Sequence, residues 1–125
     1  MVPYGSPDEI GVIQLAWLGD SVWELHQRLR HVHIPLKSKE LHLSVVNEVK
    51  AESQSKSLGH IEHLLNANEI DLIRRARNKT KRYPKSSNPT IYSRATGFET
   101  LIGWLFLKYP QRLSTLFDYL EITVH

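Results

Sequence analysis

Residues 15–22 read LAWLGDSV and residues 95–103 read ATGFETLIG, so each of two apolar segments holds one acid. Asp20 stands in the first segment and Glu99 in the second. A carboxylate among apolar neighbours costs free energy unless a cation pairs with it. A divalent metal ion is one such partner, and a metal site near a cationic surface indicates chemistry on phosphate.

A glycine accompanies each acid: Gly19 precedes Asp20, and Gly103 lies four residues after Glu99. Glycine inside a helix costs about 1 kcal/mol relative to alanine, so we expect the two helices to pack closely here. At 100° per residue, Glu24 shares a face with Asp20, and the two like charges repel unless a cation lies between them or both stay solvated. The alternative is that the acids are boundary residues that reach solvent.

Apolar residues recur at helical spacing along the whole chain, and we find no alternating strand pattern, so the sequence predicts an all-α fold. Capping residues are expected at Ser6, Ser38 and Asn68, and breaks at Gly59 and before Pro110. The expected helices cover residues 7–30, a segment from Ser38 that 51–58 either continues or follows as a new helix, then 69–78, 92–108 and the stretch after Pro110. Residues 79–91 contain two prolines and are expected to form a loop.

The first helix carries apolar residues on more than one face, among them Ile13, Trp17, Leu18 and Trp23. A helix with one buried stripe does not need them all. Either this helix takes part in a subunit interface, or it lies at the centre of a monomeric core.

Positive charge is concentrated in one segment. Eight of the sixteen basic residues lie between residues 74 and 94, and no acid occurs from Leu72 to Phe98. The remaining residues hold eight basic and thirteen acidic side chains, so a mildly acidic body carries one strongly basic stretch. This asymmetry indicates a polyanionic partner.

The bulk composition fits one soluble domain over residues 1–125. No apolar run approaches the roughly 20 residues of a membrane span, and no charged head followed by an apolar stretch indicates a signal peptide. The chain has no cysteine, which excludes disulfides and thiolate zinc sites. We expect a cytoplasmic protein without a membrane partner.

The two acidic segments resemble the two catalytic helices of the ribonuclease III family. Residues 18–22, LGDSV, resemble the centre of its signature, and residues 94–105, RATGFETLIGWL, resemble its second catalytic helix. The short branch called Mini-ribonuclease III is more similar, since VKAESQ at 49–54, RRARN at 74–78 and the loop before Tyr92 also fit. The similarity runs from about Leu15 to Leu113.

This resemblance implies an all-α homodimer that hydrolyses double-stranded RNA with Mg²⁺, or Mn²⁺ in its place, and leaves 5′-phosphate ends. The Mini branch is associated with maturation of precursor 23S ribosomal RNA in the bacterial cytoplasm or plastid stroma. By position, Asp20 and Glu99 are the catalytic, metal-binding acids. The metal would polarise the scissile phosphate and supply the attacking hydroxide.

The chain departs from the longer enzymes of the family at three acidic positions, which are Ile13, Ala16 and Thr96 here. The Mini branch shares this loss of acids. As a hypothesis, Glu24 and Thr96 hold metal-bound water. The missing acids also favour an alternative, a catalytically inactive fold that binds RNA or the ribosome. A third reading is a helical protein-interaction module with an acidic partner.

The sequence contains no separate double-stranded RNA-binding domain, so the catalytic domain is expected to hold RNA by itself. Contacts to A-form RNA fall mainly on phosphates and 2′-hydroxyls. The expected RNA-binding residues lie at the end of one helix and in the loop that follows: Arg74, Arg75, Arg77, Asn78, Lys79, Lys81, Arg82 and Lys85.

Overall fold

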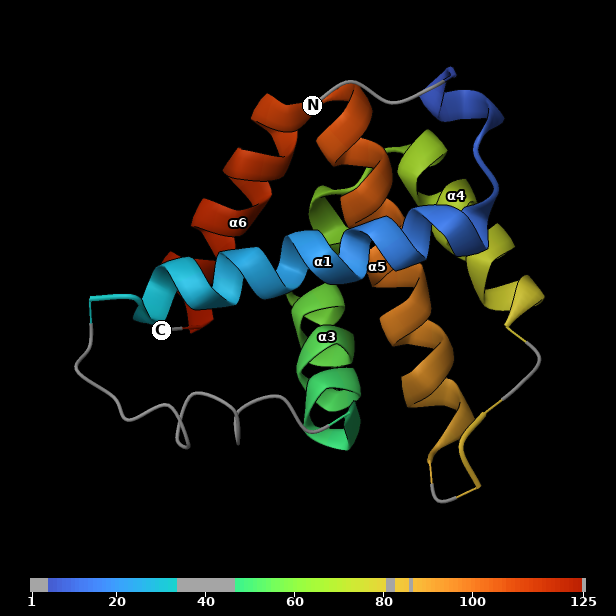
Figure 1. Ribbon diagram of the computed structural model, residues 1–125, viewed down its shortest axis with the longest axis horizontal. Coiled ribbons are helices and arrows are strands. Elements are labelled where there is room, and N and C mark those ends of the chain that lie inside the picture. Colours follow the sequence, from blue (N-terminus) through green and yellow to red (C-terminus); the bar gives the residue numbers. More distant parts are fainter. Residues whose placement is uncertain (1–4, 34–46, 81–82, 86, 125) are drawn as a thin grey trace.

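The structure is a computed structural model that describes residues 5–33, 47–80, 83–85 and 87–124, and every regular element in them is helical (Figure 1). The all-α prediction is therefore confirmed. None of the described helices is long and apolar enough to cross a membrane. The elements are the short 3₁₀ helices η1 (Pro7–Glu9) and η2 (Glu62–Leu64) and the helices α1 (Val12–His31), α3 (Asn47–Ile61), α4 (Ala67–Lys79), α5 (Pro89–Lys108) and α6 (Pro110–Val124).

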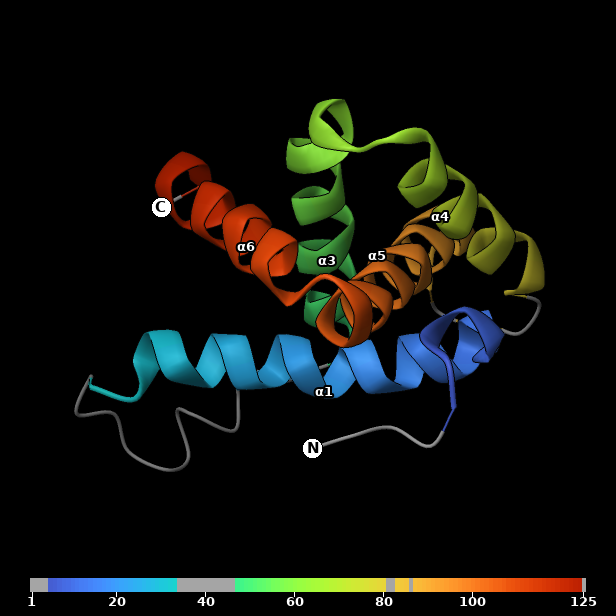
Figure 2. The same cartoon turned by 90° about the horizontal axis from the view of Figure 1, so that it is seen from above.

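Helix α5 lies at the centre of the molecule. Its residues Phe98, Leu101, Ile102 and Leu105 are almost completely buried, so this helix is apolar on several faces. Helix α1 runs along one side of α5, while α3, α4 and α6 lie on the other (Figure 2). Of the two alternatives for the first helix, the position at the centre of the core does not hold, because α5 takes that place and Trp17 on α1 is 80% exposed.

Helices α1 and α5 form the closest helix pair, and their backbones touch at two glycines. A Cβ atom on Gly19 would overlap the carbonyl oxygen of Glu99, and one on Gly103 would overlap the carbonyl oxygen of Leu15. No larger side chain fits at either position without moving backbone. The expected close packing beside the two acids is confirmed.

The first expected helix is divided in two. Ser6 caps η1 as expected, but Ile10 is extended, and α1 begins only at Val12. The Gly11 N–H donates to Oε1 of Gln14 over 3.2 Å, which satisfies one of the free donors at the start of α1.

Three further boundaries differ from expectation. Gly59 does not break a helix but lies inside α3 with a helical backbone. Asn66, not Asn68, caps α4, because Asn66 and Glu69 have the spacing for a reciprocal capping box, with bonds of 3.0 and 2.9 Å. Helix α5 starts at Pro89, since the Asn88 side chain accepts from the backbone N–H of Thr90 and of Ile91. The expected cap at Ser38 lies outside the described residues.

Candidate active site

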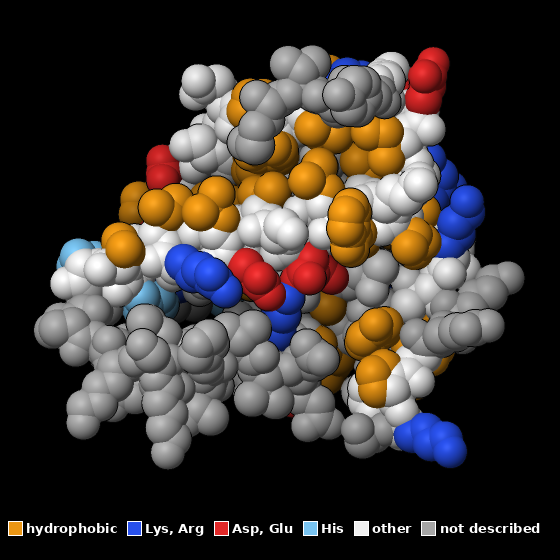
Figure 3. All heavy atoms as spheres, viewed as in Figure 1, with side chains coloured by type: hydrophobic (Ala, Val, Ile, Leu, Met, Phe, Trp, Pro, Cys, Tyr) orange, Lys and Arg blue, Asp and Glu red, His pale blue; other side chains and the backbone are white. Residues whose placement is uncertain are grey.

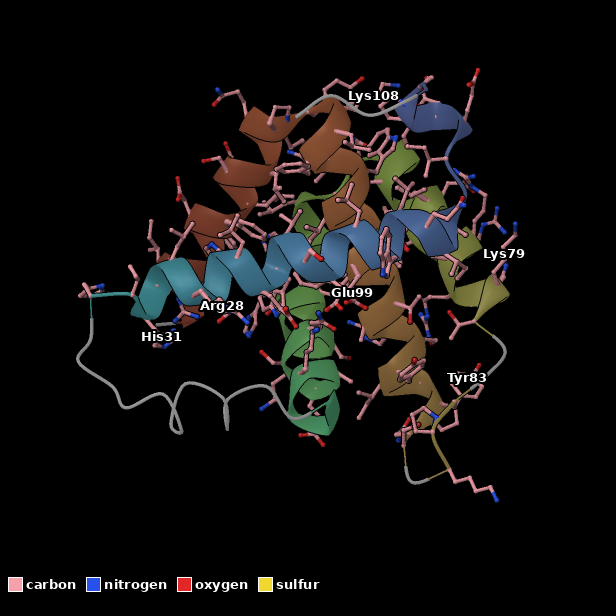
Figure 4. All side chains as sticks on the ribbon, viewed as in Figure 1. Arg28, His31, Lys79, Tyr83, Glu99 and Lys108 are labelled. Atoms are coloured by element: carbon pink, nitrogen blue, oxygen red, sulfur yellow. The ribbon has the colours of Figure 1, made fainter. Side chains whose placement is uncertain are left out.

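A shallow cleft of about 500 Å³ lies between α1, α5 and the end of α4. It contains both acids that the sequence singled out, together with Thr96 and Lys79. Figure 4 shows Glu99 behind the middle of α1 and Lys79 at the end of α4. The whole lining consists of Ile13, Ala16, Trp17, Asp20, Lys79, Thr80, Tyr92, Thr96 and Glu99.

A lysine from α3 joins the acids of α1. The Lys50 ammonium donates to Oδ1 of Asp20 and, over 3.0 Å, to Oε1 of Glu24. The Lys50 side chain is 15% exposed, and that of Asp20 is 39% exposed. Figure 3 shows acidic side chains grouped at the middle of the face over α1, with basic side chains to the left of and below them and apolar side chains to the right. A cation between the two acids removes the repulsion expected of Asp20 and Glu24.

Glu99 is the more deeply placed acid. Burial raises the pKa of the Glu99 carboxyl to about 7, and nearby Glu24 adds to this, although the Gln54 amide and Lys50 act in the opposite direction. Among the described residues, Nε2 of Gln54 is buried and has no partner in hydrogen-bond geometry. Glu99 therefore lies in surroundings where its charge is costly unless a further cation arrives.

The donor set fits a hard divalent ion. The described residues contain no ready-made group of three metal-ligating side chains. Mg²⁺ does not need one, because it binds through one or two carboxylates and keeps water and phosphate oxygens as its other ligands. Asp20 and Glu99 supply that number of carboxylates in one cleft, while Ile13 and Ala16 line it without offering a ligand.

The first part of the basic segment is used within the protein. Arg74 and Arg75 pair with Asp71 over 2.7 and 3.1 Å, although both side chains stay more than half exposed. The Arg77 guanidinium donates to Oγ of Ser93 over 3.1 Å and ties α4 to α5. Their expected contacts with RNA stay predictions.

The residues after Arg77 are more open. Asn78, Lys79 and Lys85 are exposed, and Lys79 lines the cleft. Lys81 and Arg82 lie outside the described residues. Tyr83 packs edge to face against Tyr92, whose ring borders the same cleft.

Sequence reasoning did not assign Lys50 or Gln54 to the site. Both lie within the VKAESQ stretch, four residues apart, and this spacing places them on one face of α3. The helical spacing predicts that the two side chains share a face, but it does not predict which residues of other helices that face contacts. Only the packing of α3 against α5 brings these side chains to acids on two other helices.

In comparisons with known proteins, one family model and the relatives that match the chain agree. The model of the Ribonuclease III domain matches residues 13–110. A Mini-ribonuclease 3 of Synechococcus sp. is 43% identical over 109 residues, which are 87% of this chain and 79% of that protein. A Mini-ribonuclease 3 of Gloeobacter violaceus is 40% identical over 102 residues, which are 82% and 76% of the two chains.

A solved structure agrees with this result. The crystal structure of a protein from Fusobacterium nucleatum superimposes with a TM-score of 0.81 and 26% sequence identity. The superposition covers 94% of this chain and 96% of that one. The arrangement of the helices described above is therefore one that an experimentally determined protein shares.

Proposed function

The chain belongs to the ribonuclease III family and is an endoribonuclease, and from this premise we propose where and how it acts. It cleaves double-stranded RNA at the cleft between α1 and α5, in a reaction that depends on Mg²⁺. The observation that carries the proposal is the presence of Asp20 and Glu99 in one cleft, beside the basic end of α4. Acids that bind a metal and cations that bind phosphate are the two parts that phosphodiester hydrolysis needs.

Asp20 and Glu99 would hold the ion, with Mn²⁺ as a substitute for Mg²⁺. The ion supplies Lewis-acid polarisation of the scissile phosphate and lowers the pKa of water. Glu99 would carry its charge fully only in this state, since burial disfavours the free carboxylate. Thr96 lines the cleft, and Glu24 lies one helical turn after Asp20. Both therefore stay candidates for holding water molecules that are bound to the ion.

The RNA would lie over the cleft and the end of α4. Lys79, which lines the cleft, and Lys85 are exposed cations. Lys81 and Arg82 belong to the same proposed RNA-binding surface by their position in the chain. Arg74, Arg75, Arg77 and Asn78 would extend it along α4. Such contacts hold the phosphates of an A-form duplex without reading its sequence.

The active form would be a homodimer of this single domain, residues 1–125. Support comes from α1, where Ile13 and Trp17, which line the cleft, are 49% and 80% exposed. Large apolar side chains grouped on a surface mark interaction sites, and a second copy bound there would place two cleavage sites on one duplex.

The proposed substrate in the cell is precursor 23S ribosomal RNA, in a bacterial cytoplasm or a plastid stroma. The support is the similarity to proteins named Mini-ribonuclease 3 from organisms such as Synechococcus, Gloeobacter violaceus and Desulfitobacterium hafniense. Mapping the cut ends on a transcribed 23S precursor would test this assignment separately from the activity on a plain duplex.

The experiment that tests the activity is cleavage of a labelled RNA duplex by the wild type, Asp20→Asn and Glu99→Gln. We expect cleavage by the wild type in Mg²⁺, abolished by EDTA and reduced at least about a hundredfold in both variants. Asp118→Asn, an exposed acid on α6 outside the proposed RNA-binding residues, is the matched control and should cleave normally.

The second candidate is a catalytically inactive RNA-binding protein. The observation in its favour is that Ile13 and Ala16 stand in the cleft where longer relatives of the family hold acids. RNA binding without cleavage by the wild type and by both variants, in Mg²⁺ and in Mn²⁺, would decide for this reading.

A further inference from the structure

Lys50 lies among acids that belong to two other helices. Its ammonium comes from α3 and contacts carboxylates at two successive turns of α1, Asp20 and Glu24. Glu99 of α5 also acts on this ammonium electrostatically. Lys50 thus lies at the meeting point of three acids from two helices, although burial outweighs the attraction of Glu99 and lowers the pKa of the ammonium.

We propose that Lys50 is an internal counter-ion that a divalent metal displaces from Asp20, and that Glu24 retains its ammonium after the displacement. This inference rests on the proposed metal-dependent function. Asp20 is the residue that both cations need: it contacts Lys50 in this structure and is the proposed ligand of the metal. A divalent ion and an ammonium a few ångströms apart in a partly buried site repel each other strongly, so direct coordination of the ion by Asp20 disfavours the contact between Asp20 and Lys50.

Glu24 has the geometry for the second part of the proposal. Its Oε1 accepts from the Lys50 ammonium over 3.0 Å, so the lysine keeps one partner when Asp20 turns to the metal. The ammonium needs only a small movement within the site, and no unpaired charge is left at the contact between α1 and α3. Since Ile13 and Ala16 offer no ligand, Glu24 is the remaining acid on this face of α1.

Two consequences follow. The metal-free protein is stabilised by Lys50, because Asp20 and Glu24 are then neutralised. The metal, in contrast, binds more weakly than it would without the lysine, since each binding event must first move a competing cation.

The test is a titration of Mn²⁺ followed by the electron paramagnetic resonance of the free ion, with RNA absent. Lys50→Met removes the charge and keeps a long apolar side chain, and Lys56→Met, an exposed lysine of the same helix, is the control. We expect Mn²⁺ to bind Lys50→Met about tenfold more tightly than the wild type. Lys56→Met should match the wild type, and Asp20→Asn should lose this binding.

Thermal unfolding of the same proteins gives a second readout that does not depend on activity. In EDTA, Lys50→Met should melt at a lower temperature than the wild type. Saturating Mn²⁺ should raise the melting temperature of Lys50→Met by more than it raises that of the wild type. If Lys50→Met does not fold, Lys50→Gln serves for both measurements, with the same expected direction.

Equal or weaker Mn²⁺ binding by the Lys50 variant would overturn the displacement and leave the metal site standing. Binding by neither the variant nor the wild type would overturn the displacement together with the metal role of the proposed function. Mn²⁺ binding that persists in Asp20→Asn would place the ion elsewhere and overturn the competition for Asp20.

Discussion

Gly19 of α1 packs directly against the backbone carbonyl of Glu99 on α5. Because Asp20 follows Gly19 in the chain, this one contact sets the register that brings both acids to the same cleft. The reciprocal contact of Gly103 with the carbonyl of Leu15 fixes the crossing at a second point. Two helices that approach this closely leave little freedom in the relative position of their side chains.

Replacement of Gly19 by alanine should therefore destabilise the protein by about 3 kcal/mol or more, since the added methyl overlaps a carbonyl that cannot move alone. Gly59→Ala is the control. Gly59 lies inside α3, and a Cβ added there would be 3.6 Å from its nearest neighbour, a guanidinium nitrogen of Arg94, so the change should stabilise the protein by up to about 1 kcal/mol. Urea unfolding of both variants measures the difference. Equal stability of the two variants would contradict the close backbone contact.

Glu99 should make the stability of the metal-free protein depend on pH. Its folded pKa of about 7 lies above the ordinary value of 4.5, so its protonated form favours the folded state. That contribution is complete below pH 4.5 and is lost as the pH rises to 7, by up to about 3 kcal/mol. Glu99→Gln should remove this fall in EDTA, as measured by urea unfolding at several pH values. Glu52→Gln, an exposed acid on α3, should keep it, and a fall of the same size in Glu99→Gln would refute the assignment.

The buried carboxylate of Glu69 should depend on a single arginine. Its side chain is 1% exposed, and Arg112 pairs with both of its oxygens over 2.5 and 2.7 Å. Burial alone raises the pKa of Glu69, but the bonds from Arg112 and from the Asn66 N–H outweigh it and lower the pKa below its usual value.

Arg112→Met should therefore cost about 3 kcal/mol at neutral pH, because an unpaired charge is left inside the fold. The cost should shrink as the pH falls and Glu69 takes up a proton. Arg75→Met breaks a comparable but exposed pair with Asp71 and should change the melting temperature little. A similar loss for both variants would contradict the difference in burial.

Lys79 and Lys85 should contribute to RNA affinity through phosphate contacts. The double change Lys79→Ala and Lys85→Ala should weaken binding to duplexes of any sequence and lower the slope of log affinity against log salt by about one to two. Filter binding in Ca²⁺, at several salt concentrations, measures both effects. Lys56→Ala on α3 is the control, and an unchanged slope in the double variant would remove these two residues from the interface.

Trp17 should hold two subunits together if the exposed face of α1 is the dimer contact. Trp17→Glu is expected to shift the protein from dimer to monomer in analytical ultracentrifugation, since a charge in an apolar interface is left unpaired. Ile122→Glu changes an equally exposed apolar residue of α6 and should leave the dimer intact. A monomeric wild type would refute the proposed assembly.

The sequence alone determined the helical class, the two acidic segments and their close approach, because these depend on local periodicity and on glycines that are costly without a packing reason. It also separated the basic segment from the acidic body. Charge counting could not show that Arg77 is held by Ser93 while Lys79 faces the cleft, since both follow from the orientation of α4.

Tertiary structure decided which helix is central and which cation meets the acids. Both α1 and α5 carry apolar residues on more than one face, and only their packing leaves Trp17 outside and Phe98 inside. Lys50 and Asp20 are 30 residues apart, and no local pattern relates them. Their contact exists because α3 and α1 both pack near α5, so the electrostatics of the site arise from the arrangement of three helices and not from any single segment.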